Sequence, residues 1–265
     1  MIARDLDAHF RAVGTWVSWE KTTDVFKAGD PDREVKRIAV AWKANWPAMK
    51  EAHARGAELF VSHESIAVEA LNGDPDPEAK FALPAEQPKF HWLGESGLVV
   101  YRCHDFWDNY PEEGIRWNWQ RMLQLGADVV GDAYPYLVTQ TTPRTLEALA
   151  RHVLEIVRPL GQNGVNVIGD PRQEVSRIAT GTGVSTDALK MMELGADVGI
   201  LTDDYYLHVR MGELARELGF TAIVVNHGVA EERGIEALAA YIARQFPAAD
   251  VFHLPQRCPY QVLTG

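Results

Sequence analysis

Apolar runs typical of β-strands alternate with amphipathic runs typical of helices along most of this chain of 265 residues. Strands are expected at 37–42 (RIAVAW), 59–63 (LFVSH), 98–105 (LVVYRCHD), 165–170, 177–182, 198–203, 221–227 and 250–254. Helices are expected at 47–55, 143–158, 185–194, 206–218 and 232–245. Residues 70–96 are rich in proline and charge without clear periodicity, which predicts a long irregular excursion at the surface. The alternation itself predicts an α/β fold.

The sequence also contains an internal repeat. EVKRIA at 34–39 recurs as EVSRIA at 174–179, and each copy is followed by Gly-Ala-acidic and an apolar strand. The first copy ends in Ser62-His63-Glu64 and the second in Thr202-Asp203-Asp204. The glycine of each Gly-Ala-acidic phrase stands just past an expected helix, where a left-handed cap is needed.

Within one unit spanning 1–265, this repeat predicts two similar α/β lobes, 1–128 and 129–265. Functional groups at the ends of equivalent strands would then face the cleft between the lobes, with the C-terminal segment contributing ligands to the first-lobe site. A (β/α)8 barrel also fits the length, but it predicts regular βα units throughout, and the stretch at 70–96 does not fit that pattern.

Composition narrows the class of protein. A net charge of -11 argues against nucleic acid as a partner, because the surface would repel a phosphate backbone. Cys103 and Cys258 are the only cysteines and form no C-x-x-C pair, which favours a reducing cytoplasm. The charged start, MIARDLDAHF, does not match a signal peptide, and no stretch is apolar enough for a membrane span. A cytoplasmic location is therefore expected.

Three expected strands are each followed directly by imidazole and carboxylate side chains. The candidates are His63 with Glu64, His104 with Asp108, and His227 with Glu231. Imidazole nitrogen and carboxylate oxygen are the ligands of Zn, Mn or Fe in hydrolytic centres, and several carboxylates allow one to bridge two ions. Taken singly, each has another explanation: a hydrogen-bonded loop histidine, a turn-forming Asp108, or a first-turn helix charge at Glu231. Their shared position after strands favours a metal site.

These segments resemble those of the Nif-three-like proteins, also called GTP cyclohydrolase I type 2-like. The family's Gly-Ala-Asp strand with a His-His pair, its His-Thr-Asn-Leu-Asp segment and its Gly-His-x-x-x-Glu-Arg segment have counterparts here in GAELFVSHE, HDFWD and NHGVAEERG. The resemblance runs from Trp19 to Pro255. It implies a dinuclear metal centre whose ligands include His63, Asp108, His227 and Glu231.

Two residues of these segments need separate comment. Glu64 stands where the family commonly has its second histidine, and an anionic oxygen there favours harder ions such as Mn or Mg over Zn. His104 opens the middle segment, close enough to Asp108 to be an outer partner of the metal ligands or a proton donor.

The function expected from these residues is metal-assisted hydrolysis of a small molecule, possible substrates being nucleotides and phosphorylated compounds, with two divalent ions (Zn, Mn, Fe or Mg). The GTP cyclohydrolase label implies attack at a purine ring carbon, although the chain has no P-loop to identify a nucleotide. The alternative is a non-catalytic regulatory or scaffold protein in which the metal ions organise a ring. The resemblance implies a homo-oligomer, with a hexameric ring as one form.

Overall fold

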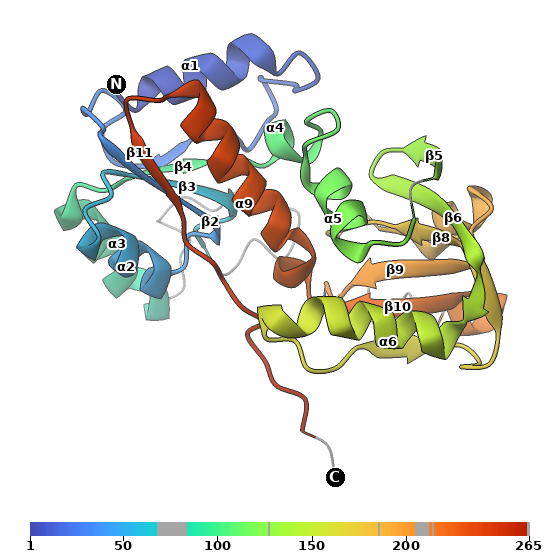
Figure 1. Cartoon of the computed structure of the whole chain (residues 1–265). Helices are drawn as coiled ribbons and strands as arrows, with labels where there is room; N and C mark the ends of the chain where they lie inside the picture. Colours follow the sequence, from blue (N-terminus) through green and yellow to red (C-terminus); the bar gives the residue numbers. More distant parts are fainter. Residues whose placement is uncertain (68–83, 127, 185, 205–211, 214, 264–265) are drawn as a thin grey trace. The chain divides into compact units, whose positions relative to one another are not determined.

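The computed structural model describes residues 1–67, 84–126, 128–184, 186–204, 212–213 and 215–263 (Figure 1). The chain divides into two compact units, each with its own sheet. Unit 1 comprises Met1–Gly114 and Ile235–Pro255, and unit 2 comprises Ile115–Gly234 and Gln256–Gly265. Compared with lobes at 1–128 and 129–265, the chain changes units earlier and returns to unit 1 near its end.

Unit 1 contains a five-stranded sheet in the order β1-β4-β3-β2-β11. β2, β3, β4 and β11 are parallel, and β1 is antiparallel to its neighbour β4. The strands are β1 (Phe26–Ala28), β2 (Arg37–Lys43), β3 (Leu59–Glu64), β4 (Val99–Arg102) and β11 (Asp250–His253). The helices are α1 (Arg4–Val13), α2 (Trp46–Ala54), η3 (Pro84–Glu86), α3 (Gln87–Ser96), α4 (Asp105–Asp108) and the later turns of α9 (His227–Gln245).

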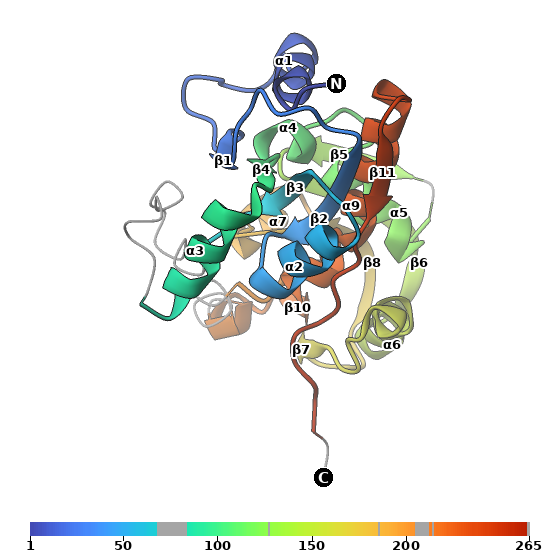
Figure 2. The ribbon, with the colours of Figure 1, turned by 90° about the vertical axis from the view of Figure 1, so that its left-hand side faces the viewer.

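Helices cover both faces of the unit 1 sheet, which is why its central strands are apolar on both sides. On one face Ala39 and Phe60 pack against α2 and α3, which lie side by side in Figure 2. On the other face Tyr101 of β4 contacts Phe10 of α1, with ring centroids 5.9 Å apart. Loops leave the carboxyl ends of the parallel strands, and the candidate ligands of unit 1 lie at these strand ends or directly after them.

Unit 2 contains a six-stranded sheet in the order β5-β6-β8-β9-β10-β7. β8, β9 and β10 are parallel, and the remaining pairings are antiparallel. The strands are β5 (Val129–Ala133), β6 (Tyr136–Thr145), β7 (Asn166–Ile168), β8 (Glu174–Thr180), β9 (Val198–Thr202) and β10 (Thr221–Val225). The helices are α5 (Ile115–Leu123), α6 (Leu146–Val157), η4 (Arg158–Leu160), α7 (Ala188–Glu193) and the first turns of α9.

The core of unit 2 explains why α5 belongs to it. Trp119 and Leu123 of α5 pack in one cluster with Leu149 and Val153 of α6, on the face of the sheet that carries Ile200. The opposite face packs against α7 through a second cluster, which includes Met191.

The repeated phrases of the sequence fold in the same way in the two units. In unit 1, β2-α2-β3 gives a parallel strand pair, and the Glu58 carboxylate accepts hydrogen bonds from the backbone N–H groups of Lys36 (2.6 Å) and Arg37 (3.0 Å). In unit 2, β8-α7-β9 gives another parallel pair, and the Asp197 carboxylate accepts from Ser176 (2.9 Å) and Arg177 (3.0 Å). The acidic residue of each Gly-Ala-acidic phrase thus fastens the amino end of one strand to its neighbour.

Several sequence expectations differ from the structure or fall outside it. The strand expected at 98–105 ends at Arg102, and the helix expected at 143–158 begins at Leu146, because 143–145 belong to β6. The irregular excursion at 70–96 is wrong for its last part, because η3 and α3 occupy 84–96, where the apolar side of α3 packs on the sheet. Residues 68–83, and most of the helix expected at 206–218, lie outside the described residues. The last long helix begins at His227 rather than at 232.

Among the residues that the structure describes, no helix combines the length and apolar character needed to cross a membrane.

Candidate metal centre

In unit 1 the candidate ligands come from the ends of two adjacent parallel strands. His63 and Glu64 are the last two residues of β3, and the neighbouring strand β4 is followed by His104 and α4. α4 is a single helical turn, closed by a hydrogen bond from the Asp108 N–H to the His104 carbonyl (2.9 Å). This turn brings Asp108 back over the strand ends, where His63 lies.

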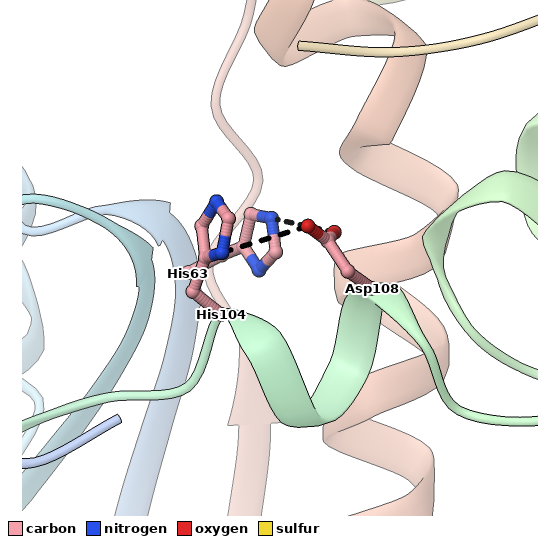
Figure 3. Close-up of side chains that lie close together, drawn as sticks. All are labelled: His63, His104 and Asp108. Carbon is pink, nitrogen blue, oxygen red and sulfur yellow. Dashed lines mark ion pairs between the residues drawn. The ribbon is translucent and has the colours of Figure 1, made fainter. Parts of the chain in front are cut away.

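His63, His104 and Asp108 form one compact group, and Figure 3 shows the rings and the carboxylate together. One potential ligand atom from each lies within 4.8 Å of the others. Asp108 Oδ1 is 3.3 Å from His63 Nε2, and Oδ2 is 3.5 Å from His104 Nδ1. The two imidazole rings stack with centroids 4.5 Å apart. Two nitrogen donors and a carboxylate at this spacing match the ligand chemistry of a transition-metal ion.

The surroundings of His63 fix which of its nitrogens is available. Its Nδ1 is 3.0 Å from the backbone carbonyl oxygen of Cys103, which can only accept a hydrogen bond. The Nδ1–H therefore donates to this carbonyl, and Nε2 faces Asp108, where it can offer a lone pair to a metal ion that displaces its proton. A histidine held by a carbonyl in this way is the usual arrangement of a metal ligand. The side chain is fully buried, so its direction is fixed.

The charges of this group depend strongly on one another. Burial alone lowers the pKa of His104, but Asp108, Asp105 and Glu64 outweigh it and raise the pKa to about 10. Burial alone raises the pKa of Asp108, but the positive charges of His104 and His63 outweigh it and lower the pKa. The hydrogen bond with His104 lowers the pKa of Asp105 to about 2. Without metal, a proton on His104 balances carboxylates that a cation could balance instead.

Glu64 lies beside the group with a cationic neighbour of its own. Its Oε2 is 3.5 Å from Nη2 of Arg102, and its Oε1 is 3.9 Å from Nε2 of His104. Arg102 also donates from Nε to the carbonyl of His63 (3.0 Å). The guanidinium therefore holds both the backbone and the carboxylate at the end of β3.

In unit 2, His227 and Glu231 occupy the first turns of α9, so the spacing of four residues places them on one face of a helix. His227 Nε2 is 2.9 Å from Glu231 Oε1, and His227 Nδ1 is 2.9 Å from Asp204 Oδ1. Asp204 follows β9, which is the strand parallel to β10. The histidine thus lies between two carboxylates.

Burial alone lowers the pKa of His227, but Glu231 and Asp204 outweigh it and raise the pKa well above its ordinary value. Asp204 also accepts a hydrogen bond from the Thr202 hydroxyl (2.6 Å), which holds its carboxylate in place. With Nδ1–H of His227 donating to Asp204, Nε2 faces Glu231, where a cation can replace its proton. Carboxylate, imidazole and cation in this order form the familiar support of a protein metal ligand.

The structure brings the predicted residues into two groups, with His63, Glu64, His104 and Asp108 in unit 1 and His227 and Glu231 in unit 2. The sequence reasoning gave no role to Asp24 or Asp105, which contact His104, and gave Asp204 no contact with His227. Asp105 and Asp204 also come just after strands, so the rule that found the other residues applies to them. Asp24 precedes a short edge strand, and no sequence pattern marks it.

Comparisons of sequence and of structure with known proteins point to the same family. The model of the family Duf34/NIF3 (NGG1p interacting factor 3) matches residues 24–258. A protein of Halobacterium salinarum named GTP cyclohydrolase 1 type 2 homolog is 25% identical over 229 residues, covering 83% of this chain and 85% of the relative. The crystal structure of a Bacillus cereus protein related to NIF3 has a TM-score of 0.77 at 13% identity, covering 99% of each chain. That of the Staphylococcus aureus hypothetical protein SA1388 has a TM-score of 0.74 at 19% identity, also covering 99% of each chain.

Proposed function

Because the chain belongs to the Duf34/NIF3 family, we propose that it is a metal-dependent hydrolase that uses two divalent ions to act on a small nucleotide or phosphorylated substrate. The observation that carries this proposal is the meeting of His63, His104 and Asp108, with ligand atoms within 4.8 Å of one another. Divalent ions supply a water of lowered pKa and polarise the bond under attack.

In this proposal His63 and Asp108 hold one ion. The Cys103 carbonyl keeps the His63 lone pair on Nε2, and the low pKa of Asp108 keeps its carboxylate charged. His227 and Glu231 hold the second ion, with Asp204 orienting the imidazole. Glu64 is a further oxygen ligand, and its position beside Arg102 moderates its charge. An oxygen-rich set of this kind favours Mn²⁺ or Mg²⁺.

His104 is the proposed proton donor to the leaving group. Asp105 and Asp108 lie beside its Nδ1 and fix the direction of its ring. A role as metal ligand is the competing assignment, because its nitrogen lies within ligand distance of the same group. Replacement by Gln separates the two: a proton donor loses turnover with the metal count unchanged, whereas a ligand loses metal as well.

The test of function is steady turnover by the Mn²⁺-loaded full chain. GTP is the first substrate, since a curated relative carries the name GTP cyclohydrolase 1 type 2 homolog, followed by other nucleotides and simple phosphoesters. Asp108→Asn should abolish turnover, while Asp32→Asn, at an exposed ion pair with Arg4, should not change it. A metal-loaded chain that turns over none of these compounds would overturn the hydrolase and favour the metal-binding scaffold.

The number of ions needs a separate measurement. Elemental analysis of the Mn²⁺-loaded chain should give two ions per chain. One ion per chain would contradict the proposed pair of ions.

A further inference from the structure

Asp24 is a fully buried carboxylate to which the proposed chemistry gives no role. It receives hydrogen bonds from three successive backbone N–H groups: those of His104 (2.7 Å), Asp105 (2.9 Å) and Phe106 (2.8 Å). These are the amides at the start of α4, which have no partner within a one-turn helix. Asp24 thus fixes the backbone that carries His104 at one end of the turn and Asp108 at the other.

Unit 2 contains a counterpart of this arrangement. The Asp203 carboxylate accepts a hydrogen bond from the backbone N–H of His227 (2.9 Å), at the start of α9. It also accepts from the side-chain amide of Asn226 (3.1 Å) and from the hydroxyl of Tyr260 (2.8 Å). In both units an acidic side chain therefore accepts a hydrogen bond from the backbone N–H of a histidine that follows a parallel strand, β4 in unit 1 and β10 in unit 2.

We propose that Asp24 and Asp203 are positioning residues for metal binding, each fixing the backbone from which a histidine of the metal centre projects. This inference rests on the proposed function, because it assumes that the residues on the two anchored turns bind metal. Coordination tolerates errors of only about 0.5 Å in its ligands, so a ligand-bearing turn without a rigid anchor binds metal weakly. Loss of an outer partner of this kind costs roughly 10–100-fold in metal affinity.

The hydrogen-bond pattern predicts what an isosteric replacement does. One oxygen of Asp24 accepts from His104 and Asp105, and the other accepts from Phe106. Asparagine keeps the shape but replaces one oxygen with an NH₂ group, which cannot accept. Asp24→Asn therefore turns at least one N–H of α4 against another donor, and the turn loses its fixed position.

Asp197 offers a matched control. It accepts two backbone N–H groups of β8, one on each oxygen, so Asp197→Asn also loses a carboxylate-to-backbone bond. It stands just before β9, whereas the metal residues of unit 2 follow the parallel strands β9 and β10. A purely structural contribution should appear in all three variants, and a positioning contribution only in Asp24→Asn and Asp203→Asn.

The experiment measures the Kd for Mn²⁺ by electron paramagnetic resonance of the free ion, on the full chain, with thermal unfolding recorded for each variant. We expect Asp24→Asn and Asp203→Asn to weaken Mn²⁺ binding about 10-fold and Asp197→Asn to leave the Kd at the wild-type value. Wild-type affinity in both site variants, or equal weakening by Asp197→Asn, would overturn the proposal.

If Asp24→Asn does not fold, Asp203→Asn decides alone, because its carboxylate is only half-buried and its replacement is less disruptive. A wild-type chain that binds no Mn²⁺ would refute the proposed function instead, and with it the positioning role.

Discussion

Asp108→Asn tests how the charges of the unit 1 group contribute to stability. The replacement keeps the shape of the side chain but removes the negative charge that faces His63 at 3.3 Å and His104 at 3.5 Å. In the metal-free chain, Asp108 is the largest of the causes that raise the pKa of His104 to about 10. Without this charge, that pKa should fall, although Asp105 and Glu64 still raise it.

The pH range of the effect follows from the two pKa changes. His104 has a raised pKa, so its contribution is fully present below the unfolded value of 6.5 and is lost as the pH rises through about 10. Asp108 has a lowered pKa, so its contribution is present above 3.8 and is lost as the pH falls below that value. The pair of His104 and Asp108 therefore stabilises the chain most strongly between the two unfolded pKa values, 3.8 and 6.5. Removing one partner of a largely buried polar pair costs about 1–3 kcal/mol, which is the loss expected for the variant near pH 6.

The assay is urea unfolding of wild type and Asp108→Asn in the presence of a chelator, at pH 6, 8 and 10. The difference in free energy of unfolding should be largest at pH 6 and should shrink towards pH 10. Histidine resonances in NMR titrations give the pKa of His104 directly and should show it lowered in the variant. A stability difference that does not change across this pH range would refute the assigned charge coupling.

Three other outcomes are expected. Saturating Mn²⁺ at about 100 times its Kd should add about 2.7 kcal/mol and raise the Tm by roughly 5–10 °C for each ion bound, as measured by calorimetry, and a chelator should reverse this shift. Glu231→Gln should remove the negative partner of His227 Nε2 and lower the metal content by one ion per chain in elemental analysis. Glu155→Gln on α6 is an exposed control. Two retained ions in Glu231→Gln would contradict this assignment. Phe106→Ala should lower the free energy of unfolding in urea by about 3–5 kcal/mol, because Phe106 is fully buried and its ring stacks on Phe10 with centroids 4.4 Å apart. A loss below about 1 kcal/mol would show that this packing is not needed for stability.

The parallel strands of both sheets were predictable because each is a short apolar run bounded by turn residues, as in 59–63 and 198–203. The elements that the sequence reasoning missed lack this contrast. α5 (Ile115–Leu123) mixes apolar, polar and charged residues, and only its packing with α6 in the core of unit 2 gives it a defined place. α3 follows a proline- and charge-rich stretch in the sequence, so the helical spacing of its apolar residues is not evident from the sequence. Tertiary packing decides such segments, and local composition does not.

The residues of the candidate site also differ in how clearly the sequence marks them. The sequence singles out the candidate ligands because each lies at or just after the end of an apolar strand or in the turn that follows; they are His63, Glu64, Asp108, His227 and Glu231. Asp24 was not identifiable, because its carboxylate reaches His104 across about eighty positions of sequence and forms hydrogen bonds only with the backbone. A backbone N–H is the same in every residue except proline, so a partner bonded to it imposes almost no pattern on the sequence around it. Residues that hold the backbone of a candidate ligand in place are therefore expected to be found from structure, whereas candidate ligands at strand ends can be proposed from sequence.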